Sequence, residues 1–312
     1  MKKTILAQKV LASVLTIGVG GFVLPLAVHA NSGLGDEPQE IKYFSVKYYM
    51  GTNGAANNMV IIDSDLPDEE AKGAIGGYAE TGAAENNRVT VSGGTFKSVI
   101  TGGYAASGNA TDNVVNISGG TITGELNGGY AAASGKVTGN IVNITGGTII
   151  SRRIENDFIN IPIGGIYGGR AVGENSIVQG NSVNISGKAL LNDFYEMGFI
   201  GGGYASGANS QVTDNSVNIS GGTINNSNIS GGHAKTGTVE NNSVNVSGGM
   251  VKGEVYGGYV LNGGNDAAIK GNSITLSGMA DVSEAALYGG YIRNRNENET
   301  GTIANNKLII NG

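Results

Sequence analysis

Residues 102–130 read "GGYAASGNATDNVVNISGGTITGELNGGY", and this stretch decides the fold, because it ends on the letters with which it begins. Inside it, "NVVNI" alternates polar and apolar side chains and places β-branched residues on one face, which predicts a β-strand. The following "SGGT" is typical of a tight corner. The stretch therefore predicts one unit of a repeating β-structure.

The same pattern recurs along the chain. Each copy begins with an Asn that is followed two and four residues later by an apolar pair, such as Val115 and Ile117 after Asn113. The nine Asn are Asn58, Asn87, Asn113, Asn140, Asn181, Asn215, Asn242, Asn272 and Asn306. The shortest interval between them is 26 residues, which is too short for a propeller blade of about 40–45 residues. We expect an all-β chain, a parallel β-helix (β-solenoid) of about nine coils over residues 43–312.

The nine Asn have the same parity as their apolar pairs, so we expect their side chains to point inward. A buried amide is costly unless it is hydrogen-bonded. Amides stacked about 4.8 Å apart bond to one another, which predicts an Asn ladder inside the solenoid. The alternative is that Asn is present only because it tolerates turn geometry.

The N-terminus carries the pattern of a secretory signal peptide. "MKKTILAQK" is basic, "VLASVLTIGVGGFVL" is apolar, and "PLAVHA" ends in small residues, which predicts export across the inner membrane and cleavage after Ala30. Residues 31–42 are then a short linker. The chain has no Cys, so an exported form has no disulfides. The full chain has a formal net charge of −6, and cleavage removes Lys2, Lys3 and Lys9, so the exported form has (19 − 3) − 25 = −9. This acidic balance argues against a nucleic-acid partner.

The two ends of the repeat region differ. "YFSVKYYMGTNGAAN", residues 43–57, is an altered copy whose aromatic start we expect to cover the N-terminal end of the core. "NNKLIING" ends the sequence directly after a predicted core strand. We therefore expect the solenoid to be truncated at Gly312.

The signal peptide, the absence of Cys and the tandem "NNSVNVSGG…VYGGY" units resemble the passenger regions of bacterial autotransporter adhesins over residues 43–312. The resemblance implies a non-catalytic β-helix at the cell surface or outside the cell. Such a passenger attaches to a host or cell-surface protein or glycan, or to itself. It also implies a C-terminal translocator barrel, whose alternating strands this sequence lacks. The alternatives are a structural surface or biofilm-matrix protein and a β-helix enzyme that acts on polysaccharides.

Two longer segments leave neighbouring copies at the same phase, "SRRIENDFINIPI" (151–163) and "LLNDFYEMGFI" (190–200). In a solenoid they would lie side by side as one lateral protrusion, and aromatic and Arg side chains anchor interfaces. The candidate ligand-binding residues are Arg152, Arg153, Phe158, Phe194, Tyr195 and Phe199. The alternative is that both segments fold back over their own coils.

"GGY" recurs in six copies and predicts a stripe of aromatic side chains. The tyrosines are Tyr78, Tyr104, Tyr130, Tyr204, Tyr259 and Tyr291. Arg170 and His233 replace Tyr in two further copies, so we expect the position to face solvent. The stripe then either binds sugars by ring stacking or stabilises the shaft without a partner.

The sequence carries little that suggests chemistry, and we expect no catalytic residue and no cofactor. His233 is the one His outside the signal peptide, and we expect it to be a surface substitution. "DSDLPDEE" offers Asp63, Asp65 and Asp68 as a weak Ca²⁺ candidate, but its spacing matches no calcium motif, which favours a solvated acidic loop.

Overall fold

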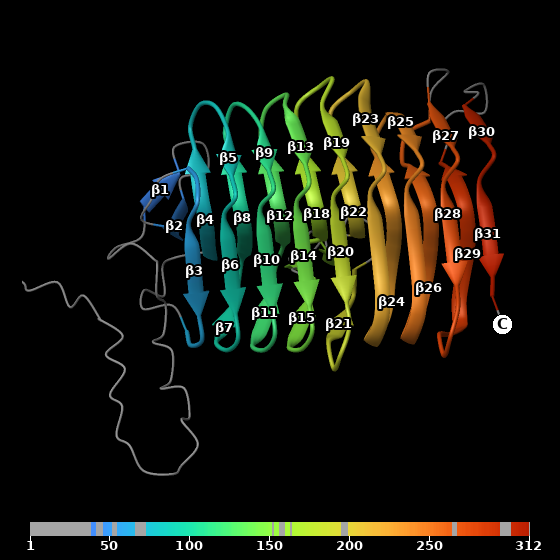
Figure 1. Cartoon of the computed structure of the whole chain (residues 1–312), viewed down its shortest axis with the longest axis horizontal. Coiled ribbons are helices and arrows are strands. Elements are labelled where there is room, and N and C mark those ends of the chain that lie inside the picture. Colours follow the sequence, from blue (N-terminus) through green and yellow to red (C-terminus); the bar gives the residue numbers. More distant parts are fainter. Residues whose placement is uncertain are drawn as a thin grey trace, which may run out of the picture.

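The computed structural model describes residues 39–41, 46–51, 55–65, 73–151, 153–155, 160–162, 164–194, 199–263, 267–293 and 301–311. In these ranges the regular secondary structure is all β-strand, so the prediction of an all-β chain is confirmed (Figure 1). Among the same residues there is no helix that could cross a membrane. The predicted signal peptide, residues 1–30, lies outside them.

The strands that follow the repeated Asn stack side by side along the long axis of the molecule (Figure 1). Each pairs in parallel with its counterpart one repeat later, so Val115 lies opposite Val89 on one side and Val142 on the other. These strands are β3 (Met59–Ile62), β6 (Arg88–Val91), β10 (Val114–Ile117), β14 (Ile141–Ile144), β20 (Ser182–Ile185), the starts of β24 (Ser216–Ala234) and β26 (Ser243–Val260), β28 (Ser273–Leu276) and β31 (Lys307–Ile310).

Beyond the "SGGT" corner, two further sets of strands belong to the same large sheet. The first set is β7 (Thr95–Phe96), β11 (Thr121–Thr123), β15 (Thr148–Ile150) and β21 (Leu190–Asn192). The second set carries Gly-Gly-Tyr: β4 (Gly73–Ala79), β8 (Val99–Ala105), β12 (Leu126–Ala131), β18 (Ile166–Ala171), β22 (Ile200–Ala205) and the ends of β24, β26 and β29 (Asp281–Ile292).

A separate eight-stranded sheet completes each repeat. It consists of β5 (Ala84–Glu85), β9 (Ala110–Thr111), β13 (Lys136–Thr138), β19 (Ile177–Gln179), β23 (Ser210–Thr213), β25 (Gly237–Glu240), β27 (Ala268–Lys270) and β30 (Thr302–Ala304). Its strands are also paired in parallel, each with its counterpart in the next repeat. This pairing is solenoid-like.

The interior holds two apolar columns. The larger contains the first eight apolar pairs after the repeated Asn, such as Val115 and Ile117, together with Ile122 and Leu126 of the same repeat. The smaller contains apolar residues of the eight-stranded sheet, such as Val137, packed against the residue that follows each Gly-Gly-Tyr, such as Ala131. Stacking of like side chains between repeats removes both columns from water, which is the main stabilising term in such folds.

The repeated Asn side chains form a hydrogen-bonded ladder, as their inward parity predicts. The Asn113 Nδ2 donates to the Asn140 Oδ1 at 2.9 Å and to the Ala84 carbonyl oxygen at 2.9 Å. The Asn140 Oδ1 also accepts from the Asn113 backbone N–H. The pattern links all nine Asn in sequence. The cost of burying the amides is thereby offset along the whole column.

The residue before each ladder Asn forms a turn that explains why the Asn side chain points inward. These nine positions are occupied by Asn, Asp or Gly, and all of them have positive φ, such as 54° at Asp112 and 58° at Asp214. These are the residue types that adopt the left-handed conformation at least cost. The turn therefore directs the following Asn inward.

At the N-terminal edge of the large sheet, an antiparallel pair of strands adjoins β4. β1 (Gln39–Ile41) runs antiparallel to β2 (Val46–Met50), and β2 pairs in parallel with β4. β1 thus lies within the segment predicted as a linker. Of the predicted aromatic cap, Tyr43 and Phe44 lie outside the described residues. At the opposite edge, β31 leaves Leu308 and Ile310 exposed.

Candidate functional site

The side chains at the Tyr position of Gly-Gly-Tyr stack on one another along the molecule. Ring centroids are 5.0 Å apart between Tyr104 and Tyr130 and 5.7 Å between Tyr259 and Tyr291. The expectation that the column faces solvent is wrong for Tyr104 and Tyr259, which are each 5% exposed. Tyr78, Tyr130 and Tyr204 are half-buried, and Tyr291 is 38% exposed.

The tyrosines are buried because a second column of side chains lies beside them on the same outer side. Each member of this second column is the residue three positions before the Tyr position. Strand alternation would place the two columns on opposite faces, but the Gly pair interrupts it. A Cβ added to Gly258 would meet the Asn272 amide in the interior, and one added to Gly257 would meet the Gly289 carbonyl of the neighbouring strand. The second column is Ile75, Thr101, Asn127, Tyr167, Gly201, Ser230, Tyr256 and Tyr288.

Arg170 continues the stack where Tyr is missing. Its guanidinium lies 5.2 Å from the ring centroid of Tyr130 and 5.7 Å from that of Tyr204, which is cation–π distance. It also forms an ion pair with Glu125. Burial by itself would lower the pKa of Arg170, but Glu125 raises it above its ordinary value, so the side chain stays charged.

His233 occupies the Tyr position in β24, and the expectation that it is a surface substitution is wrong. It is 4% exposed, because Phe199 packs over it at 4.4 Å between ring centroids. In the two repeats at this point the second column holds small residues, Gly201 and Ser230. Burial lowers the pKa of His233 to about 3, so the imidazole is neutral at ordinary pH. Neither ring nitrogen has a hydrogen-bond partner within the described structure.

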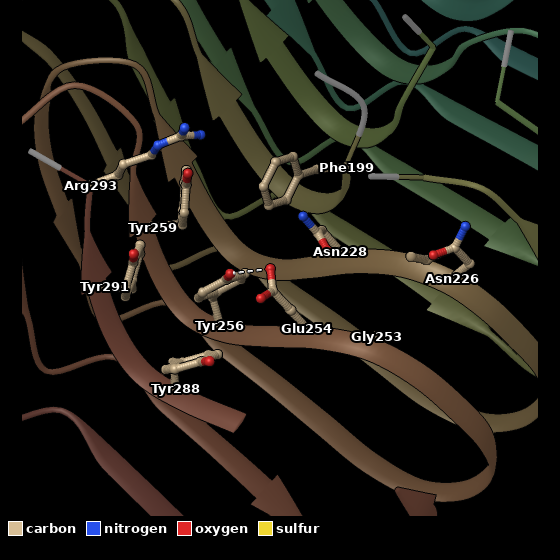
Figure 2. Close-up of a pocket in the computed structure, with 11 residues that line it drawn as sticks. Phe199, Asn226, Asn228, Gly253, Glu254, Tyr256, Tyr259, Tyr288, Tyr291 and Arg293 are labelled. Carbon is tan, nitrogen blue, oxygen red and sulfur yellow. Dashed lines mark hydrogen bonds between the residues drawn. The ribbon is translucent and has the colours of Figure 1, made fainter. Parts of the chain in front are cut away.

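Beyond Phe199 the two columns open into an aromatic groove, the tyrosine trough, defined by Tyr256, Tyr288, Tyr259 and Tyr291 (Figure 2). Tyr256 stacks on Tyr288 at 5.1 Å and Tyr259 stacks on Tyr291 at 5.7 Å. The two stacked pairs are inclined to each other by 61° at the inner end and 57° at the outer end. The trough is V-shaped, and its cavity volume is about 450 Å³.

Polar groups lie at the rim of the trough (Figure 2). The Tyr256 hydroxyl donates to the Glu254 Oε2 at 2.6 Å. Burial and then this hydrogen bond raise the pKa of Tyr256 above its ordinary value. Burial raises the pKa of Tyr259, an effect that the nearby Arg293 partly opposes, and Asn228 also lines the cavity. A carboxylate, a guanidinium and an amide are therefore available to a molecule lying on the rings.

The first of the two longer segments contains a hairpin. β16 (Arg153–Glu155) and β17 (Asn160–Pro162) form an antiparallel two-stranded sheet separate from the two larger sheets. The ends of the segment are close, because the Ser151 Oγ donates to the Gly164 carbonyl oxygen at 2.8 Å. Of the candidate binding residues in this segment, Arg153 lies in β16, whereas Arg152 and Phe158 lie outside the described residues.

The described residues of the second segment, 190–194 and 199–200, pack onto the main sheet. Its first residues form β21, which pairs in parallel with β15 and β24 and places Leu191 in the larger apolar column. Phe194 is 0% exposed in that same column, so no face of its ring is open to a ligand in this structure. Phe199 is a wall of the tyrosine trough. Tyr195 lies outside the described residues.

Two carboxylates of the acidic loop, those of Asp63 and Asp65, belong to the described part of the chain. Asp63 is half-buried and Asp65 is exposed, and the Asp65 Oδ1 accepts a hydrogen bond from the Thr95 backbone N–H. Asp68 lies outside the described residues. Within the described part of the chain, no three His, Cys, Asp or Glu side chains are placed to hold a metal ion.

A second Asn ladder runs on the outer surface and was not predicted. The Asn143 Nδ2 donates to the Asn116 Oδ1 at 2.9 Å, and Asn184, Asn218 and Asn245 continue the series. Its signal in the sequence is the Asn that precedes the second apolar residue, as in "NISGG" and "NVSGG". These Asn are half-buried, so the outer ladder is a lesser stabilising element than the inner one.

No protein-family model, curated protein or solved structure matches this chain. Its function is therefore inferred from its residues and their geometry.

Proposed function

We propose that the protein is an exported, non-catalytic β-solenoid of about nine coils that mediates attachment or aggregation at the bacterial cell surface, as the passenger region of an autotransporter-type adhesin. The signal-peptide pattern and the tandem repeats favour this location and family. The tyrosine trough is the observation that carries the binding function, because it is an aromatic cavity with polar groups at its rim.

The architecture suits a binding module that must hold its site in place. Each ladder amide is fixed by hydrogen bonds to its neighbour, for example from the Asn215 Nδ2 to the Asn242 Oδ1 at 2.9 Å. Tyr256 and Tyr259 lie in strand β26, whose parallel pairing with β24 and β29 holds the two columns in register. Aromatic rings held by strands need little ordering when a partner binds, which favours affinity.

The rim chemistry favours binding over catalysis. Glycoside hydrolysis commonly uses two carboxyl groups that flank the bond to be broken. Of the described residues that line the trough, Glu254 is the one with a carboxyl group, and it already accepts a hydrogen bond from Tyr256. We therefore prefer a binding function to the alternative of a polysaccharide-acting enzyme.

The hairpin of β16 and β17 is a second candidate for attachment. It forms its own sheet, so it is separate from the strands that make the solenoid. A hairpin of this kind can present side chains to a partner protein, which is how loops on a rigid scaffold commonly bind. This role retains the binding function predicted for residues 151–163.

Adhesion of beads coated with the secreted protein to cells and to one another tests the proposal. We expect attachment that falls when Tyr288 and Tyr291 are both replaced by Ala, and that survives Tyr78→Ala, a matched change at the other end of the same column. If attachment is lost on removal of residues 152–163 but survives the Tyr288 and Tyr291 substitutions, the hairpin is the attachment site. Beads that bind neither cells nor one another would overturn the proposal, and bead–bead association alone would favour the matrix alternative.

A further inference from the structure

We infer that the tyrosine trough is a saccharide site, and that it takes a neutral hexopyranose ring against the faces of Tyr288 and Tyr291. This inference rests on the proposed function and names the ligand class of the same site. Tyr288 and Tyr291 are 36% and 38% exposed, so part of each ring is open to a ligand.

The geometry of the rings fits a sugar better than it fits another aromatic ligand. A pyranose presents C–H groups on its faces and hydroxyls around its edge, so it packs against ring faces while its edge stays polar. The rings of Tyr288 and Tyr291 are inclined by 57° with centroids 5.6 Å apart. Two inclined faces contact a chair-shaped ring on adjacent sides, whereas a flat aromatic ligand stacks on one face at a time.

Buried rings support the exposed ones. Tyr256 is 4% exposed and Tyr259 is 5% exposed, and each stacks on the outer ring of its own pair. Phe199 contacts both, with centroids 6.3 Å from Tyr256 and 5.2 Å from Tyr259. The inner rings therefore hold the outer pair at a fixed angle, and the cavity is within the usual size range of small-molecule sites, about 300–1,000 Å³.

The rim groups match the hydroxyls of a neutral sugar. Carboxylate, guanidinium and amide groups form hydrogen bonds with hydroxyls as acceptors or donors. Glu254, Arg293 and Asn228 supply one of each at the trough. The carboxylate and the guanidinium balance each other in charge, because a sugar acid that Glu254 repels is attracted by Arg293. The rim therefore carries no excess of positive charge that would select a uronic or sialic acid over a neutral hexose.

The chain contains no Trp, so its intrinsic fluorescence comes from its 13 Tyr, of which four line the trough. Isothermal titration calorimetry therefore measures the affinity, and a fluorescence change that Tyr288→Ala and Tyr291→Ala abolish assigns the binding to the trough. We would titrate cellobiose and lactose as neutral probes and glucuronic acid and sialyllactose as acidic probes. We expect the neutral disaccharides to bind, and Tyr288→Ala and Tyr291→Ala each to weaken binding by about tenfold or more, as the loss of a ring contact does. Tyr291→Phe, which keeps the ring, and Tyr78→Ala should change binding by less than about threefold. Circular dichroism of each variant establishes that the β-structure is retained.

The outcomes separate the inference from the proposed function. Attachment to cells that depends on Tyr288 and Tyr291, without binding of any saccharide, would overturn the inference and leave the proposed function in place. Binding of the acidic probes alone would also overturn it. Self-association that is abolished by Tyr288→Ala, again without saccharide binding, would show instead that the outer rings contact a second copy. Saccharide binding by beads that attach to nothing would support the inference and overturn the proposed function.

Discussion

Gly232 and Asn242 lie against each other across the interior of one repeat, where a Cβ on Gly232 would be 2.5 Å from the Asn242 Cγ. The same closeness holds between the second Gly of each Gly-Gly-Tyr and the ladder Asn that follows it, as at Gly258 and Asn272, where the distance would be 2.8 Å. The two landmarks of the repeat are therefore coupled, because the buried amide occupies the space that a side chain would need.

Gly232→Ala should destabilise the protein by about 1–3 kcal/mol, because the added methyl group overpacks the interior against the Asn242 amide. Urea unfolding followed by circular dichroism measures this. In a double-mutant cycle with Asn242→Ala, the Gly substitution should cost less, with a coupling of about 0.5–3 kcal/mol. Additive effects would show that the two residues do not compete for the same space.

Asn215→Ala should lower the free energy of unfolding by roughly 3–5 kcal/mol. The substitution leaves the Asn181 backbone N–H and side-chain amide without the Asn215 Oδ1, and the Val178 carbonyl without its donor. Asn218→Ala is the matched control, because Asn218 is half-buried in the outer ladder and its loss should cost less than about 1 kcal/mol. Equal costs for the two variants would contradict a stabilising role of the inner ladder.

The sequence predicted most of the strand arrangement, because the alternation after each Asn repeats with little variation. The inward direction of the repeated Asn and of the β-branched pairs follows from alternation within a single strand, so it could be predicted from parity alone. The outer ladder of Asn116 and its counterparts was missed, although its residues recur just as regularly. Parity places those Asn on the outer face. That their amides bond to one another follows only from the in-register pairing of neighbouring repeats, which brings them close together.

The candidate site was harder to predict for two physical reasons. The Gly pair interrupts alternation, so Tyr256 and Tyr259 share one side although their separation of three residues predicts opposite sides. Phe199 belongs to a longer segment of one repeat but packs on His233 of the next, and no pattern within one repeat predicts such a contact. A large residue placed beside small ones, Gly201 and Ser230, was the available signal.

Stability should depend on pH through His233. Its pKa in the folded protein is about 3, below the ordinary value of about 6.5, so the unfolded chain binds the proton first as pH falls. The contribution is fully present above pH 6.5 and is lost toward pH 3, by up to about 1.4 kcal/mol per pH unit. Phe199, Tyr204 and Tyr259, which pack against the imidazole, carry no charge in this range.

Urea unfolding of the protein and of His233→Phe at pH 7, 6, 5 and 4 isolates this effect. The difference in unfolding free energy between the two proteins should change steadily below pH 6.5, in favour of the variant. A difference that stays constant over this range would mean that His233 is accessible to protons in the folded state.

Phe194→Ala should destabilise the protein by about 3–5 kcal/mol, since Phe194 is fully buried in the larger apolar column. Replacement of residues 152–163 by a short Gly-Ser linker should change stability by less than about 1 kcal/mol, because Ser151 and Gly164 are already in contact. Thermal unfolding compares the two. A Phe194→Ala protein as stable as the parent would place Phe194 outside the core after all.

The stacking of consecutive repeats is the claim on which the ladder, the two columns and the trough depend. Thr90 and Thr275 are half-buried on the outer face, and six parallel pairings connect them through Asn116, Asn143, Asn184, Asn218 and Asn245. The chain has no Cys, so Thr90→Cys and Thr275→Cys can carry spin labels without further changes. Double electron–electron resonance should give one narrow distribution centred near 29 Å, six strand spacings of about 4.8 Å. A broad distribution, or one centred beyond about 40 Å, would show that the repeats do not stack in this register.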